Sequence, residues 1–212
     1  MSCYNGPNIV TNGLVLHLDN GNTKSYPGTG SSWVDLISNT LFTGGNYDWA
    51  NDINEITINV YLQKTALDNV NYATHPVNKW NSGTGNASFV LYHFGNYQGN
   101  GDDGRFYFYI TTANNGWVGH YVGTLGLYEK AHLCFQYNSS TGSQVWLNGI
   151  KVGERSGFRG ALGVAGSSGL TIYGPIDFGQ TIVHNISFYN RDISDSEVIQ
   201  NYNAIKSRYG LT

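Results

Sequence analysis

The sequence predicts an all-β fold, a two-sheet antiparallel jelly-roll sandwich that ends in one short helix. Short runs of alternating apolar and polar residues recur along the 212 residues, and Gly and Asn separate them. Aromatic residues make up 14% of the chain and charged residues only 12%, about half of the roughly 25% usual for globular proteins. A sandwich of this length commonly forms one domain, so we expect residues 1–212 to be a single unit.

The strands are expected where the alternation is clearest. In RFYFYIT, residues 105–111, Phe106 and Phe108 point one way and Tyr107 and Tyr109 the other, which suits Phe in a core and Tyr on a half-exposed face. The same pattern predicts strands at residues 14–19, 55–61, 88–94, 105–111, 117–122, 131–137, 144–147, 150–152, 170–173 and 182–189. The least ordered segments are expected at residues 20–32, 78–85, 97–104 and 156–168.

Two local signals predict a hairpin and a helix. Asn148-Gly149 is the preferred pair for a two-residue type I′ turn, in which both central residues need a positive φ. Ser194 and Glu197 form a capping box at the start of a helix expected at residues 194–209. Gly210 is placed to end that helix, and residues 1–12 are expected to form an N-terminal arm.

Catalytic motifs are missing from the sequence. A phosphate loop needs Gly before its Lys and a helix after it, whereas Thr23 precedes Lys24 and Pro27 follows closely. Sandwich glucanases carry their acids on one strand as E-x-D-x-x-E or E-x-D-x-E, and neither pattern occurs. We therefore expect no enzyme and no catalytic residue. The alternative is a glycan-degrading enzyme in which replacing Glu55 or Asp52 abolishes an activity, and it fails if no activity on polysaccharides is detected.

Charge and hydropathy exclude further classes of function. The net charge is −3 and no basic cluster is present, so nucleic-acid binding is not expected. No run of about 18 apolar residues exists to span a membrane. The N-terminal MSCYNGPN lacks the charged and apolar regions of a signal peptide.

One loop and one turn could hold calcium. Asp102 and Asp103 lie between two glycines, and adjacent carboxylates in such a loop are ligands for hard cations. Asp19 stands at the turn after the first strand and could assist at a second position. A solvated hairpin turn explains the same residues without a metal, and one loop supplies few oxygens. We therefore predict no cofactor and keep calcium as the alternative.

Aromatic residues of three neighbouring strands could gather on one face of a sheet. Tyr and Trp stack on sugar faces, but they also build cores and protein interfaces. We therefore expect an interface or a core, with a sugar ligand as the alternative, for these candidates, which are Tyr92, Tyr107, Tyr109, Trp117 and Tyr121.

The sequence also resembles a known superfamily. AHLCFQYNSSTGSQVWLNGIKVGE resembles the central signature of laminin-G-like domains in the concanavalin A-like lectin/glucanase superfamily, and ISFYNRDISDSEVIQNYNAIKSRYG resembles their closing strand and terminal helix. The head, IVTNGLVLHLDNGNTKSYPGTGSSWVDLISN, resembles the opening of such domains in virion structural proteins of tailed bacteriophages.

That resemblance implies a non-enzymatic virion protein, a capsid decoration or cement protein that binds and stabilises the capsid surface. Its partners would be the major capsid protein, other virion proteins and copies of itself, with a trimer fitting a capsid axis. It would be assembled in the cytoplasm of a bacterial host. The alternative is a lectin-like adhesion module, displayed as a head fibre, neck or tail appendage, whose partner is a surface glycan.

Overall fold

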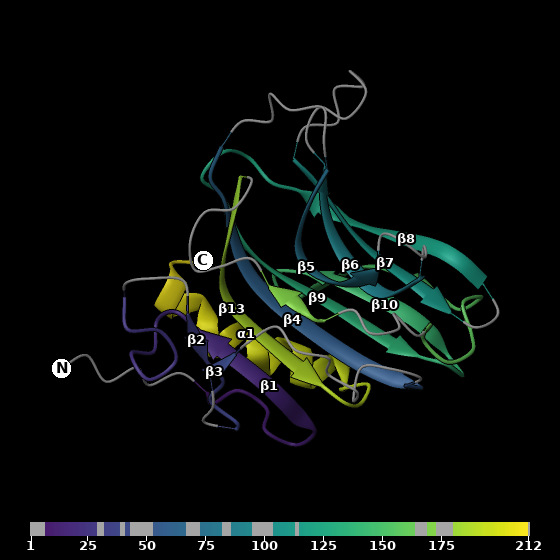
Figure 1. Ribbon diagram of the computed structural model, residues 1–212, viewed down its shortest axis with the longest axis horizontal. Coiled ribbons are helices and arrows are strands. Elements are labelled where there is room, and N and C mark those ends of the chain that lie inside the picture. The colour runs from purple at the N-terminus through teal and green to yellow at the C-terminus, as the bar shows by residue number, and fades with distance from the viewer. Residues whose placement is uncertain are drawn as a thin grey trace.

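The computed structural model is a β-sandwich with a helix on its outer side (Figure 1). It describes residues 7–28, 32–38, 41–42, 53–66, 73–81, 86–94, 104–112, 115–163, 169–172 and 180–211. The six-stranded sheet has the order β1 (Leu14–Asp19), β13 (Thr181–Tyr189), β4 (Glu55–Lys64), β9 (Lys130–Asn138), β10 (Gly142–Leu147) and β11 (Ile150–Arg155). The five-stranded sheet has the order β12 (Thr171–Ile172), β5 (Ala73–Asn81), β6 (Asn86–Phe94), β7 (Arg105–Thr112) and β8 (Asn115–Thr124). A short ribbon pairs β2 (Trp33–Val34) with β3 (Leu41–Phe42), and α1 spans Asp195–Tyr209.

All pairings within both sheets are antiparallel among the residues described, which confirms the predicted fold class. The core lies between the two sheets, because every second residue of each strand points inward. Phe108 of β7 stacks on Phe135 of β9 with ring centroids 5.2 Å apart, and Phe89 of β6 meets Phe188 of β13 at 5.7 Å. These aromatic contacts join the two sheets.

Helix α1 covers the outer face of the six-stranded sheet, away from the five-stranded one (Figure 1). Val198 lies in one buried cluster with Cys134 and Trp146, and Tyr209 stacks on Tyr61 with ring centroids 4.2 Å apart. The helix is 15 residues long, and no helix in the described part of the chain has the length and apolar character needed to cross a membrane.

The predicted helix ends and hairpin are confirmed. Glu197 N donates to Ser194 Oγ at 3.4 Å while Ser194 N donates to Glu197 Oε2 at 2.8 Å, which completes the capping box. Gly210 ends the helix in the left-handed region with φ 73°. At the hairpin, Asn148 and Gly149 have φ of 50° and 76°, as a type I′ turn requires.

Each predicted strand overlaps an observed one within the described residues, although residue 173 of the predicted strand 170–173 lies outside them; the short strands β2 and β3 and the long strand β5 were not predicted. The sequence prediction left residues 73–81 without a strand and placed 78–85 in a loop, whereas β5 runs over Ala73–Asn81. Pro76 explains the miss, since proline argues against a strand, yet here the register shifts between Thr74 and Val77 and accommodates it at a bulge. Lys79 adds to the error because it is polar but fully buried.

Candidate functional site

The outer face of the five-stranded sheet carries a continuous group of aromatic side chains. Tyr107 and Tyr109 alternate along β7 with the buried Phe106 and Phe108, so they point away from the core. Strand register places Tyr107 between Tyr92 of β6 and Tyr121 of β8. We call this surface the aromatic face and define it as His75, Trp80, Tyr92, Phe94, Tyr107, Tyr109, Trp117 and Tyr121.

The rings of the aromatic face touch one another across four strands. Tyr107 lies 5.4 Å from Tyr121 and 5.9 Å from Tyr109, centroid to centroid. Tyr109 in turn lies 4.9 Å from Tyr92 and 6.0 Å from Trp117. The rings therefore form one continuous group of aromatic contacts on the outer side of the sheet.

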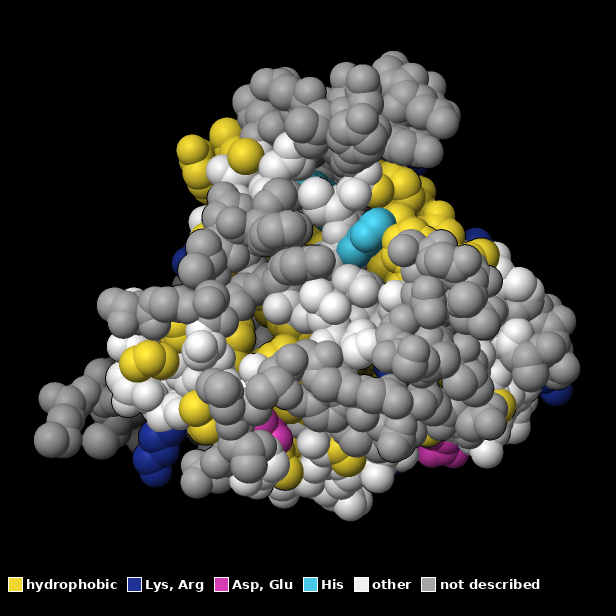
Figure 2. All heavy atoms as spheres, viewed as in Figure 1, with side chains coloured by type: hydrophobic (Ala, Val, Ile, Leu, Met, Phe, Trp, Pro, Cys, Tyr) yellow, Lys and Arg dark blue, Asp and Glu magenta, His cyan; other side chains and the backbone are white. Residues whose placement is uncertain are grey.

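The far end of the aromatic face is hollowed. Trp80 and Trp117 meet edge to face at 5.9 Å and, with Tyr92, Phe94 and Tyr109, line a depression of about 340 Å³. Hydrophobic side chains gather with a histidine beside them over the upper parts of β5 to β8 in Figure 2. The volume lies at the lower end of the range for small-molecule sites.

Nearby polar groups leave the aromatic face with little charge. Burial lowers the pKa of His75, so its imidazole is neutral at pH 7. Burial, with Tyr107 close by, raises the pKa of Tyr109, so its phenol remains protonated and able to donate a hydrogen bond. Two cations act on this face: the guanidinium carbon of Arg105 lies 5.6 Å from the centre of the Tyr107 ring, and Arg105 and Arg155 both oppose the rise in the pKa of Tyr109.

The structure brings all five aromatic candidates of the sequence together. Three members of the aromatic face were not among the candidates predicted from the sequence. Phe94 shares its strand face with Tyr92, and that parity could have identified it. His75 and Trp80 lie on β5, the strand that the sequence did not predict, so no sequence signal placed them here.

The calcium candidates have different outcomes. Asp102 and Asp103 lie outside the described residues. Asp19 is 2% exposed and is hydrogen-bonded internally: its Oδ1 accepts from Gly21 N at 2.9 Å and from the Tyr209 hydroxyl, and its Oδ2 pairs with Arg208. No group of three His, Cys, Asp or Glu residues suited to a metal ion occurs within the described ranges. The prediction of no cofactor, with calcium as the alternative, stays untested.

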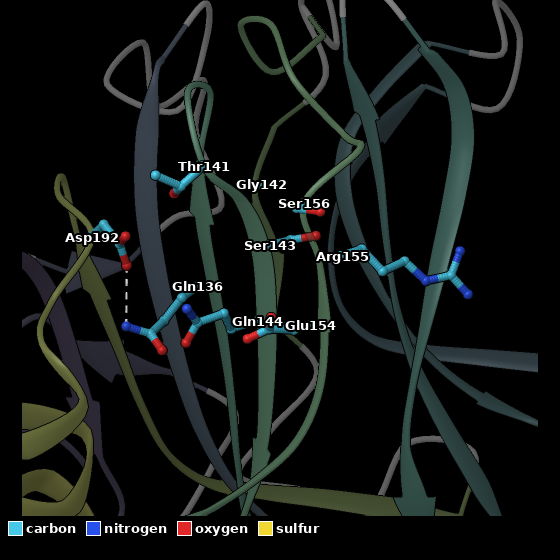
Figure 3. A pocket seen from close by; sticks show the side chains of 9 residues that line it. All are labelled: Gln136, Thr141, Gly142, Ser143, Gln144, Glu154, Arg155, Ser156 and Asp192. Carbon is cyan, nitrogen blue, oxygen red and sulfur yellow. Dashed lines mark hydrogen bonds between the residues drawn. The ribbon is translucent and has the colours of Figure 1, made fainter.

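A polar pocket of about 210 Å³ opens beside β10 and β11 and contains two carboxylates, those of Glu154 and Asp192 (Figure 3). Asp192 Oδ1 accepts from Gln136 Nε2 at 3.1 Å, and burial together with nearby Glu55 raises the pKa of Asp192. In Figure 3 the amides of Gln136 and Gln144 lie between the two acids.

Glu55, one of the two acids of the glycan-degrading alternative, has a structural role. Its Oε1 accepts from Asn138 Nδ2 at 3.0 Å and its Oε2 from Asp192 N at 3.2 Å. Asp52 lies outside the described residues.

Comparison by sequence and comparison by structure give different results for this chain. No protein family matches the sequence, and no curated protein matches it either. Solved structures do match: the sialidase of Trypanosoma rangeli in complex with sialic acid is 16% identical with a TM-score of 0.63, over 99% of this chain and 37% of that chain. The same sialidase in complex with the inhibitor DANA is 19% identical with a TM-score of 0.62, over 92% of this chain and 33% of that chain.

A bacterial binding domain has a similar structure. The binding domain of Paraclostridial Mosquitocidal Protein 1 is 14% identical with a TM-score of 0.58, over 95% of this chain and 48% of that one. The chain thus spans about a third of the sialidase and about half of the toxin domain. These matches support a jelly-roll β-sandwich, and at such identities they establish the fold alone.

Proposed function

We propose that the protein is a non-catalytic carbohydrate-binding module and that the aromatic face is its binding surface. The observation that carries the proposal is the row of touching rings that ends in the depression between Trp80 and Trp117. A pyranose ring has an apolar C–H face that packs flat against aromatic side chains, while its hydroxyl groups meet phenols at the edge.

The chemistry of the face suits the packing of apolar sugar faces. Burial lowers the pKa of His75 and raises that of Tyr109, so both side chains are uncharged at pH 7, and Arg105 and Arg155 are cations near Tyr109. Burial of apolar surface contributes about 25 cal/mol per Å² to the free energy of binding. Because several rings lie in a row, a chain of sugars would bury more apolar surface here than a single sugar.

The comparisons add support of a limited kind. Two of the similar structures are described as bound to sialic acid or as a binding domain, which are properties of those proteins. They support a fold compatible with glycan binding, and fold alone does not assign a function. The internal hydrogen bonds of Glu55 support a non-catalytic role.

A second candidate is the virion protein that the head and tail of the sequence resemble. The same exposed Trp and Tyr side chains are those that protein interfaces favour, with Trp117 40% and Tyr121 48% exposed. In this role the aromatic face would contact capsid protein or another copy of the chain, and the chain would reside on a phage particle.

One experiment separates the two candidates. Wild-type protein is run through native gels that contain neutral polysaccharides such as laminarin, hydroxyethyl cellulose, xylan and galactomannan. We expect retardation by at least one, and at least tenfold weaker retardation of Trp117→Ala. Tyr128→Ala is the matched control, because Tyr128 is 66% exposed and lies between β8 and β9, outside the aromatic face.

The contrary result is equally clear. If no neutral polysaccharide retards the protein, or if Trp117→Ala and Tyr128→Ala behave alike, the aromatic face is not a glycan site. Concentration-dependent self-association that Trp117→Ala abolishes would then favour the interface.

A further inference from the structure

The five-stranded sheet ends at strand β8, which is long and uncharged. It borders the sheet on the side away from β12 (Figure 1). An edge strand leaves a row of backbone N–H and C=O groups without a strand partner, and natural proteins usually protect such edges with short strands, charges, proline or bulges. The ten residues of β8 include no Lys, Arg, Asp or Glu and no proline.

The other three edges of the two large sheets carry such protection in the described part of the chain. Strand β1 is covered by a neighbouring loop, because Leu36 N donates to His17 O at 2.9 Å and His17 N donates to Asp35 Oδ1 at 2.9 Å. Strand β12 has only two residues. Strand β11 has a bulge and three charged residues, Lys151, Glu154 and Arg155. Strand β8 is therefore the edge that is open to pairing.

The open part of β8 is a regular stretch, residues 117–121. Register shifts interrupt the pairing with β7 on either side of it, and between them these residues face residues 107–111 one by one. No backbone hydrogen bond links the stretch to any described residue outside β7. Trp117 is 40% and Tyr121 48% exposed, and Gly119 between them is half-buried. A second strand can therefore reach this backbone.

The stretch is complementary to a copy of itself. When a two-fold axis through Gly119 relates two antiparallel strands, Gly119 lies opposite its own copy and Trp117 lies opposite Tyr121 of the second copy, once on each side of the axis. Opposite residues on one face of a sheet hold their Cβ atoms about 5 Å apart, and aromatic pairs in such positions stabilise the pairing. One register thus gives two aromatic pairs.

Charge also favours a second copy as the partner. Burial, with Arg155 nearby, lowers the pKa of His120 to about 4, so residues 117–121 carry no charge at pH 7. A charged segment would find no counter-charge in this strand, whereas a copy of the strand is itself neutral. Arg155 belongs to the neighbouring strand β11 and is exposed to solvent, which screens its charge.

We infer that two copies of this chain associate edge to edge through β8, antiparallel and across a two-fold axis at Gly119, so that their five-stranded sheets become one continuous sheet. The aromatic face then extends over both copies, with Tyr121 of the second copy beside Trp117. The association concerns the edge of the sheet and does not depend on what the aromatic face binds.

Mass in solution tests the association. Sedimentation of the wild-type protein at increasing concentration should show a species of twice the chain mass of 23.3 kDa. The double variant Trp117→Lys/Tyr121→Lys brings like charges opposite each other in both pairs, which destabilises a sheet, and should raise the Kd of the dimer at least tenfold. Tyr128→Lys is the matched control, because Tyr128 is 66% exposed and lies outside β8.

Disulfide cross-linking tests the register. Trp117→Cys and Tyr121→Cys are made as separate proteins in a Cys3→Ser background, since Cys134 is buried. Opposite residues have Cα atoms about 4.5–5.5 Å apart, which a disulfide spans, whereas the two copies of residue 117 lie four residues apart, roughly 13 Å. Oxidised glutathione should therefore cross-link the mixed proteins and neither protein alone. A mixture of Trp117→Cys and Tyr128→Cys should give no cross-link.

Three results would overturn the inference: a monomer at every concentration up to the solubility limit, a trimer or larger ring, or a dimer that forms no more cross-link in the mixture than in either single variant. Polysaccharide binding is not part of this test. A monomer that polysaccharides retard would refute the dimer alone, and a dimer that no polysaccharide retards would refute the glycan site alone.

Discussion

The ring of Tyr109 lies over the backbone of Gly119 on the neighbouring strand. A Cβ atom at Gly119 would come within 2.6 Å of two ring carbons of Tyr109. The two residues are direct partners in the register of β7 and β8. Glycine is therefore required here by the close approach of an aromatic ring that takes part in the aromatic face.

Gly119→Ala should push the Tyr109 ring off the sheet and disturb its contacts with Tyr92 and Trp117. We expect polysaccharide affinity to fall about tenfold, which corresponds to about 1.4 kcal/mol of binding free energy. Gly116→Ala on the same strand is the control, since a Cβ there meets nothing within 4 Å. Equal affinities of the two variants in native gels would contradict this account.

Gly149→Ala should destabilise the hairpin. Alanine at φ 76° is strained by about 1–2 kcal/mol, and its Cβ would lie 2.8 Å from Cδ1 of Tyr202. Urea unfolding should show this loss in the free energy of unfolding. Gly157→Ala should change it by less than about 0.5 kcal/mol, because that position has open space and no positive φ. Similar midpoints for the two would argue against a strained turn.

Ser194→Ala should remove the helix cap. The loss of a capping hydroxyl costs about 1 kcal/mol, and α1 covers much of the outer face of the six-stranded sheet. Ser207→Ala in the last turns of the same helix is a matched control. Thermal unfolding should show a lower melting temperature for Ser194→Ala alone; a shift in both variants would point to a cause other than the cap.

Acid should destabilise the protein through its buried histidines. Burial lowers the pKa of His132 to about 3 and those of His120 and His184 to about 4. The unfolded chain takes up protons near pH 6.5, so stability is complete above that pH and falls as the pH drops toward 4. Each unit of pKa difference is worth about 1.4 kcal/mol.

His132→Gln is the variant that tests this slope. His132 Nε2 contacts Asn59 Oδ1 at 3.1 Å, and its Nδ1 is buried without a partner. Urea midpoints measured from pH 7 to pH 4 should fall less steeply for His132→Gln than for wild type. Parallel profiles would show that His132 does not contribute to the pH dependence.

Much of the fold follows from local pattern, because alternation and capping are properties of short segments. Strand β1 begins and ends where the alternation of leucines predicts, at Leu14 and Asp19, and the helix boundaries follow from Ser194 and Gly210. Strand β5 could not be predicted in the same way, because the bulge at Pro76 and the burial of Lys79 depend on neighbouring strands.

The candidate site, too, was partly predictable from local sequence and partly dependent on the tertiary structure. Alternation along β7 determines that Tyr107 and Tyr109 share a face, since a strand turns every second side chain the same way. Which rings lie beside them, and that Gly119 sits under Tyr109, depend on register, which the sheet as a whole sets. The contact between Asp19 and Asn185 lies beyond any local signal, because pairing of the first and last strands brings these residues together from opposite ends of the chain.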